Sequence, residues 1–115
     1  MKRVCLAAVS LLFGSTIAHA HALLEHANPG AGAVVSPAPK GVTLDFSEGL
    51  EPSFSTVAVT NAAGQSVTSA PSAASGTQMQ VTLKPLGPGT YRVTWHALSV
   101  DTHRTQGSFV FTIKR

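Results

Sequence analysis

Sulfur is nearly absent from this 115-residue sequence. The only cysteine is Cys5, and the two methionines are Met1 and Met79. A single cysteine cannot form a disulfide within the chain, and Cys5 is too near Met1 for a lipoprotein-type cleavage site. A disulfide scaffold and a metal site built from thiolates are therefore excluded, and the hydrophobic core alone must stabilise the fold.

Charge is also scarce, since charged residues make up 11% of the chain. Beyond residue 20 the acids are Glu25, Asp45, Glu48, Glu51 and Asp101. The bases there are Lys40, Lys84, Arg92, Arg104, Lys114 and Arg115. No basic cluster interleaved with aromatic residues occurs, which argues against nucleic-acid binding. The sequence also shows no polybasic run of the kind that binds membranes.

The first twenty residues have the three parts of a secretory signal. Lys2 and Arg3 form the positive start, residues 4–13 are apolar, and Ala18-His19-Ala20 is a small-x-small cleavage site. The apolar segment is too short and too interrupted to span a membrane. We therefore predict a cleaved signal peptide over residues 1–20 and one exported domain over residues 21–115, large enough for a single core.

Cleavage after Ala20 would make His21 the first residue. An N-terminal histidine can close a chelate ring on one metal ion through its α-amine and its imidazole. These groups titrate near pH ~8 and ~6.5, so a metal can displace their protons at neutral pH. A first-position histidine can also be accidental. Cleavage after Ala18 would instead start the chain at His19 and allow a separate N-terminal chelate at the third residue, His21.

The rest of the chain has the pattern of short strands. Apolar and polar residues alternate, as in half-buried strands, and proline- and glycine-rich turns separate the runs. The expected strands cover residues 42–46, 54–60, 65–68, 79–83, 91–95 and 109–113, and residues 69–76 are expected to form a surface loop. No sustained helical period follows the leader. We predict an all-β domain of about seven strands, a small antiparallel Greek-key β-barrel or sandwich.

A second candidate feature lies between the last two expected strands. Asp101 and His103 are two residues apart, and in extended backbone such residues project to the same side. Alone, this pair is more typical of a turn, with an aspartate capping its loop and an exposed histidine. Together with His21 it would supply three nitrogens and one oxygen. Such a set in tetragonal geometry favours Cu(II) or Ni(II) over Zn(II).

Four motifs in order give the chain a specific resemblance. They are His21-Ala-x-Leu24 with Pro29-x-x-Gly32, Val42-x-Leu44-x-Phe46-Ser47-Glu48-x-Leu50, Gly89-x-Tyr91-x-Val93-x-Trp95, and Ser99-x-Asp101-x-His103-x-x-x-Gly107-x-Phe109-x-Phe111. Through nearly all of residues 21–115 the sequence resembles the CopC family of periplasmic copper-binding proteins.

The resemblance implies both a fold and a function. The fold would be a cupredoxin-like Greek-key β-barrel that holds one Cu(II) in a histidine brace. The ligands would be the amine and imidazole of His21, together with Asp101 and His103. The protein would be a monomeric periplasmic copper carrier or buffer for copper resistance or homeostasis, not an enzyme. Its partner would be a CopD-like inner-membrane copper transport protein.

The sequence departs from the family pattern at several positions. Some relatives carry a methionine-rich loop for Cu(I), whose soft character suits thioether ligands. Here Met79 alternates with strand residues and is expected in the core. Thr102 stands where relatives often have glycine, and Arg104 where proline is frequent. We expect His26 and His96 to be surface or neighbouring histidines, not ligands.

Two other functions fit parts of the sequence. Oxidative polysaccharide-cleaving copper enzymes also use an N-terminal histidine brace, but they are usually larger and present a flat binding surface. A metal-free Ig-like interaction module would make His21 incidental. The Ser47-Glu48 pair invites a catalytic interpretation, but no histidine matches it, so we expect it to bond a neighbouring loop. Tyr91 and Trp95 are expected in the core.

Overall fold

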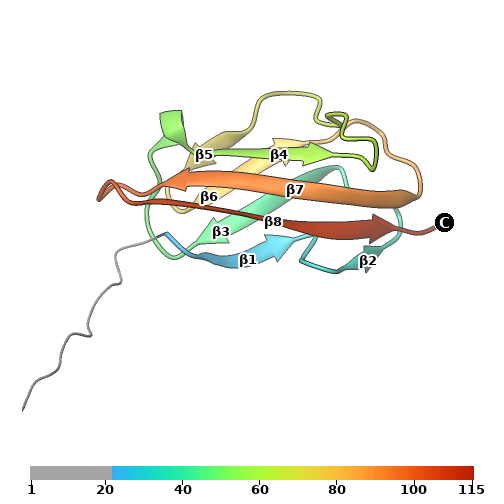
Figure 1. The fold of residues 1–115 in the computed structure, drawn as a ribbon, viewed down its shortest axis with the longest axis horizontal. Coiled ribbons are helices and arrows are strands. Elements are labelled where there is room, and N and C mark those ends of the chain that lie inside the picture. The colour runs from blue at the N-terminus through green and yellow to red at the C-terminus, as the bar shows by residue number, and fades with distance from the viewer. Residues whose placement is uncertain (1–21) are drawn as a thin grey trace, which may run out of the picture.

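A computed structural model describes residues 22–115 of the protein (Figure 1). This part of the chain forms two four-stranded sheets. The first has the order β1 (Leu24–Asn28), β3 (Gly41–Phe46), β6 (Gln78–Thr82), β5 (Ala73–Ser75). The second has the order β2 (Val34–Val35), β8 (Arg104–Ile113), β7 (Gly89–Leu98), β4 (Thr56–Thr60). Neighbouring strands are antiparallel, except that β2 runs parallel to β8.

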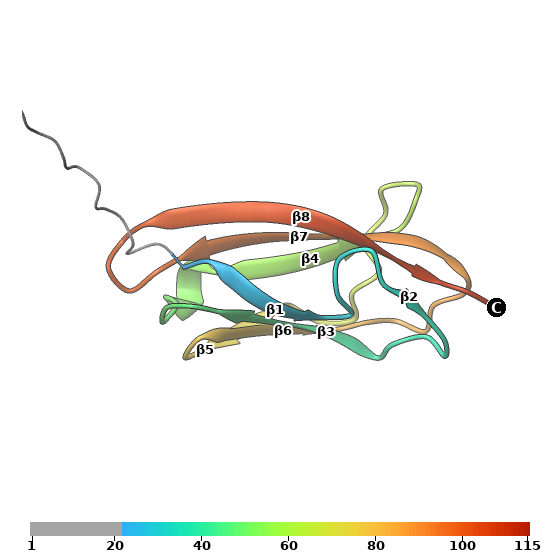
Figure 2. The ribbon, with the colours of Figure 1, turned by 90° about the horizontal axis from the view of Figure 1, so that it is seen from below.

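The two sheets lie face to face and form a β-sandwich (Figure 2). In β7, Tyr91, Val93 and Trp95 are buried between the sheets, whereas Arg92 and His96 are exposed on the outer face. This alternation is the one expected for a strand with one face on the core. The predicted all-β fold and the core positions of Tyr91 and Trp95 are therefore confirmed.

The structure corrects three details of the predicted strands. Residues 73–75, predicted to lie in a loop, form the edge strand β5, which pairs with β6. Residues 65–68 form no strand but make single bridges to Thr60 and Leu83. Phe54 belongs to a short 3-10 helix (Pro52–Phe54) and is 60% exposed. Proline at its first position suits a helical turn because its φ is fixed.

The strand directions define two ends of the sandwich. The hairpin end holds the β7–β8 connection, the start of β1 and the end of β3. The C-terminal end, marked C in Figure 1, holds the end of β8, the start of β3 and the end of β6. Both residues of the predicted Asp101–His103 pair therefore lie at the hairpin end.

Between residues 22 and 115 we find no helix that is long and apolar enough to cross a membrane.

Candidate metal centre

The β7–β8 connection is a tight turn over residues 99–103 that closes on one buried serine. The amide of Ser99 donates to the carbonyl of His103 at 2.9 Å, and the amide of Thr102 donates to the carbonyl of Ser99 at 2.8 Å. The amide of His103 donates to Ser99 Oγ at 3.2 Å. Because Ser99 is fully buried, these bonds fix the turn to the end of the sheet.

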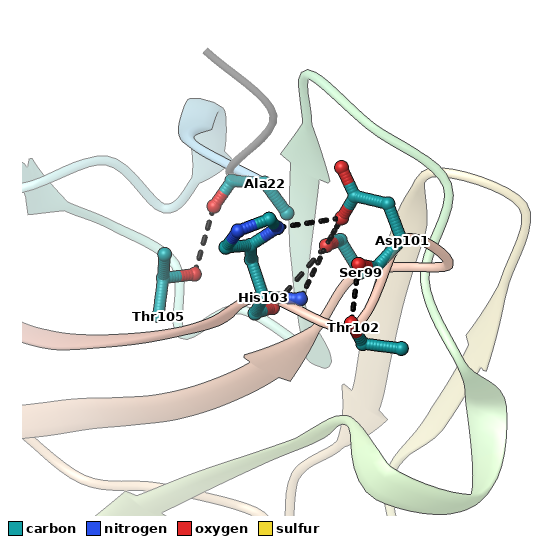
Figure 3. Close-up of polar contacts among 6 residues, drawn as sticks. All are labelled: Ala22, Ser99, Asp101, Thr102, His103 and Thr105. Carbon is teal, nitrogen blue, oxygen red and sulfur yellow. Dashed lines mark hydrogen bonds and ion pairs between the residues drawn. The ribbon is translucent and has the colours of Figure 1, made fainter. Parts of the chain in front are cut away.

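Asp101 and His103 meet on one side of this turn (Figure 3). Asp101 Oδ1 lies 3.2 Å from His103 Nδ1. The Ser99 hydroxyl donates to the same carboxylate. This bond, aided by His103, lowers the pKa of Asp101 below its ordinary value of 3.8. The side chains of His103 and Asp101 remain 47% and 37% exposed. An ionised carboxylate and an imidazole therefore converge where solvent can reach them. The predicted convergence is confirmed, but a turn with Thr102 in a left-handed conformation (φ of 74°) produces it, and not the extended backbone from which it was expected.

The start of the described chain is bonded to the same end of the sandwich. Thr105 Oγ1 donates to the carbonyl of Ala22 at 2.8 Å, and Ala22 is fully buried beside the turn (Figure 3). Leu23 is held through both backbone groups, because its amide donates to Ser47 Oγ and its carbonyl accepts from the amide of Ser47, each at 2.9 Å. Ser47 thus bonds a neighbouring segment, which confirms the structural role predicted for the Ser47-Glu48 pair as far as Ser47 is concerned.

These contacts fix the position of the residue that directly follows His21. His21 itself and the predicted signal peptide lie outside the described residues. Within residues 22–115, no three histidine, cysteine, aspartate or glutamate side chains group together as a metal site would require. The Asp101–His103 pair offers one carboxylate oxygen and one imidazole nitrogen, donors that suit Cu(II). The other donors of the predicted site belong to His21, outside the described residues.

The remaining candidate residues lie apart from this pair. His26 on β1 and His96 on β7 are both exposed, and His26 stands opposite Asp45 in the sheet. Met79 on β6 is fully buried opposite Leu44. The predictions of surface histidines and of a core methionine are thus confirmed.

Two residues that shape the site are not predicted from the sequence. In the sequence Ser99 stands out only as part of a motif, whereas in the structure its hydroxyl contacts both residues of the pair. Thr105 holds Ala22, yet the two are 83 positions apart in the sequence. Local periodicity carries no signal for such a long-range bond between a side chain and the backbone. Only the fold reveals that Thr105 fixes the start of the domain.

Comparison with known proteins gives one consistent result. The CopC domain matches residues 24–114. The chain is 39% identical to Protein YobA of Escherichia coli K12, an alignment that covers 91% of this chain and 86% of that protein. It is 37% identical to Copper resistance protein C of Xanthomonas campestris pv. juglandis, covering 92% and 90% of the two chains.

Solved structures agree in fold. The crystal structure of CopC from Methylosinus trichosporium OB3b matches with a TM-score of 0.76 and 29% identity, over 82% of this chain and 94% of that one. PcoC, a methionine-rich copper resistance protein from Escherichia coli, matches with a TM-score of 0.73 and 36% identity, over 83% and 100%. Since both the domain match and the relatives cover most of the sequence, the chain belongs to the CopC family of copper resistance proteins.

Proposed function

We propose that this protein is a periplasmic Cu(II) carrier or buffer that acts in copper resistance or homeostasis. One copper ion would be held by the α-amine and imidazole of His21, the imidazole of His103 and the carboxylate of Asp101. Membership of the CopC family supports copper as the ligand. The copper is cargo, which the protein binds and releases.

The bond from Thr105 to Ala22 is the observation that carries the proposal. A brace of this kind requires the first residue of the processed chain to reach the other ligands. Ala22 is bonded beside the turn that carries Asp101 and His103, and this supports a brace whose first residue directly precedes Ala22. The folded domain would then hold Asp101 and His103 in place, and the chain terminus would supply the other donors.

The protonation states also support binding at neutral pH. A metal ligand must be deprotonated, so metal competes with protons at every donor. The Asp101 carboxylate is ionised at neutral pH, and its lowered pKa extends the ionised range further toward acid. The contact between Asp101 Oδ1 and His103 Nδ1 keeps the carboxylate and the imidazole on the same side of the turn, where both could bind one metal ion.

The test is a Cu(II) titration of protein that begins at His21. We expect one Cu(II) per chain and a tetragonal, nitrogen-rich EPR spectrum. Changes to groups that merely support a ligand typically cost ~10–100-fold in metal affinity, so His103→Ala should cost roughly 100-fold or more. His26→Ala removes an exposed histidine and is the matched control. Equal affinity in the His103→Ala variant and the parent would place the copper elsewhere.

The other parts of the proposal have separate tests. Turnover with reductant and oxidant should be absent, which would distinguish a carrier from a copper oxidase. Fractionation should place the protein in the periplasm. Copper transfer to a CopD-like membrane protein would identify the partner, and sedimentation should give a monomer.

A further inference from the structure

The charged residues of the described chain divide between the two ends of the sandwich. The acids lie toward the hairpin end, on the start of β1, the end of β3, the connection after β3 and the β7–β8 turn: Glu25, Asp45, Glu48, Glu51 and Asp101. Four of the six cations lie at the C-terminal end, next to the start of β3 and the ends of β6 and β8: Lys40, Lys84, Lys114 and Arg115. The fold thus assembles a basic face that the linear sequence does not show.

No side-chain carboxylate of residues 22–115 pairs with a lysine or arginine of this face. In that part of the chain the one salt-bridge contact joins Asp101 to His103, at the opposite end. The length of β7, ten residues at about 3.3 Å each, separates the two ends by roughly 30 Å. At physiological salt the Debye length is about 8 Å, so the acids do not cancel the field of the distant cations.

An apolar groove opens on the same face. It has a volume of about 470 Å³, and Ala38, Pro39 and Leu86 line it beside Lys40 and Lys84. The amide of Leu83 donates to the carbonyl of Lys40 at 3.0 Å, which holds the two lysine-bearing segments together. Val34, on β2 at this end, is 62% exposed. Cationic and apolar groups therefore share one surface.

We propose that the C-terminal end docks on the anionic phospholipids of a membrane surface. Phosphate groups would lie on Lys40 and Lys84, and the glycerol and upper acyl parts would contact Pro39 and Leu86. A bilayer fits better than an acidic peptide because the cations come from the ends of several strands. Lys114 and Arg115 lie outside the groove and would add nothing to a peptide bound within it. This docking would turn the acidic hairpin end, and with it the candidate metal centre, away from the membrane.

Vesicle sedimentation of the apo protein beginning at His21 tests the docking. The parent should bind vesicles of equimolar phosphatidylglycerol and phosphatidylcholine, bind pure phosphatidylcholine far less, and dissociate at high salt. Each cation near an anionic surface raises the vesicle partition coefficient about fivefold. The double variant Lys40→Gln with Lys84→Gln should therefore lower that coefficient roughly 30-fold. Leu86→Ser should also weaken binding, but without changing its salt dependence.

The matched control is Arg92→Gln with Arg104→Gln, which removes the same charge from outside this face. Circular dichroism would show that each variant is folded. Equal weakening by both double variants would mean that total charge alone governs binding, and would overturn the docking surface. So would failure of the parent to bind anionic vesicles, or full binding by the lysine variant. None of these results depends on copper.

A second measurement tests the orientation, and it alone rests on the proposed function. Vesicle-bound protein should take up Cu(II) with the affinity of free protein, because its metal centre faces the solution. A marked loss of affinity on vesicles would place the hairpin end against the bilayer and overturn the orientation. Absence of copper binding in both free and bound protein would instead contradict the proposed function.

Discussion

The buried hydroxyl of Ser99 controls the ionisation of Asp101, because its hydrogen bond is the main cause of the lowered pKa. In apo protein, NMR titration should therefore give Asp101 a pKa below 3.8, and Ser99→Ala should raise it toward that value. A carboxyl whose pKa is lower in the folded state adds stability above its unfolded pKa, and this is lost as pH falls through the folded value.

Ser99→Ala should therefore make the free energy of unfolding fall less steeply below about pH 3.8, because Asp101 would contribute less to that fall. Urea unfolding across this pH range measures the effect. Ser66→Ala is the control, because Ser66 is exposed and its hydroxyl contacts only its near neighbour Thr68. An Asp101 pKa that does not move in the Ser99→Ala variant would show that the serine does not hold the carboxylate.

Thr102 adopts a left-handed backbone, with φ of 74°. A β-branched residue rarely does so, and the conformation costs roughly 1–2 kcal/mol for an L-residue. Glycine removes this cost but loses about 0.5–1 kcal/mol through its greater freedom when unfolded. Thr102→Gly should therefore raise the free energy of unfolding by about 0.5–1 kcal/mol, measured in denaturant. Thr102→Ala keeps the Cβ and should not stabilise; equal gains in both variants would contradict this explanation.

At the residue scale, the convergence of Asp101 and His103 is predicted correctly, but for the wrong reason. The two residues lie in the turn between β7 and β8, with Thr102 in a left-handed conformation, and not in the extended backbone from which their convergence was expected. The supports of the pair, Ser99 and Thr105, depend on which backbone groups a folded chain brings near them. Small hydroxyl residues occur throughout this sequence, and no local pattern marks these two as different.

The hairpin of β7 and β8 depends on close packing at Gly107. A Cβ added there would lie 2.7 Å from Trp95 Cζ2 in the facing strand. Trp95 in turn packs edge-on against Phe46, with ring centroids 5.1 Å apart. Gly107→Ala must displace this ring, and such overpacking typically costs 1–3 kcal/mol.

Thermal unfolding and tryptophan fluorescence would measure the effect of Gly107→Ala. Gly87→Ala is the matched control, because a Cβ there meets no atom within 4 Å. We expect the control to stay within about 0.5 kcal/mol of the parent, as surface changes usually do. Equal stability of both variants would mean that Trp95 relaxes without cost.

At the scale of elements, strands were predictable where large apolar residues alternate. Phe111 and Ile113 on β8 are buried, as their pattern required. Strand β5 (Ala73–Ser75) was missed because its residues are small and carry almost no hydrophobic signal. β5 forms because it pairs with β6, and the composition of residues 73–75 does not predict that pairing.

The whole domain should fold without metal. Its core spans both sheets, and the two candidate ligands within residues 22–115 lie on a hydrogen-bonded turn outside that core. Apo protein should therefore give a β-type far-UV circular dichroism spectrum. Copper at a hundredfold excess over its dissociation constant adds about 2.7 kcal/mol, which should raise the melting temperature by about 10 °C or more. A random-coil apo spectrum would show that copper nucleates the fold.

The first residue of the processed chain decides how the whole molecule would bind copper. Cleavage after Ala20 places alanine at both small positions of the signal and exposes the amine of His21, next to the anchored Ala22. Cleavage after Ala18 would expose His19 instead. The amine, two backbone amides and the imidazole of His21 could then wrap Cu(II) or Ni(II) in one plane, without Asp101 or His103. Intact mass of the periplasmic protein should show a chain that begins at His21.

An engineered glycine before His21 tests the chelate directly. It moves the free amine out of the ring formed with the His21 imidazole, but leaves Ala22 and its bond to Thr105 in place. Loss of a direct donor should exceed the ~10–100-fold cost of disturbing a supporting group, so Cu(II) affinity should fall roughly 100-fold or more. The circular dichroism spectrum and the apo melting temperature should not change. If the extended protein binds copper as tightly as the parent, the amine is no ligand and the histidine brace must be abandoned.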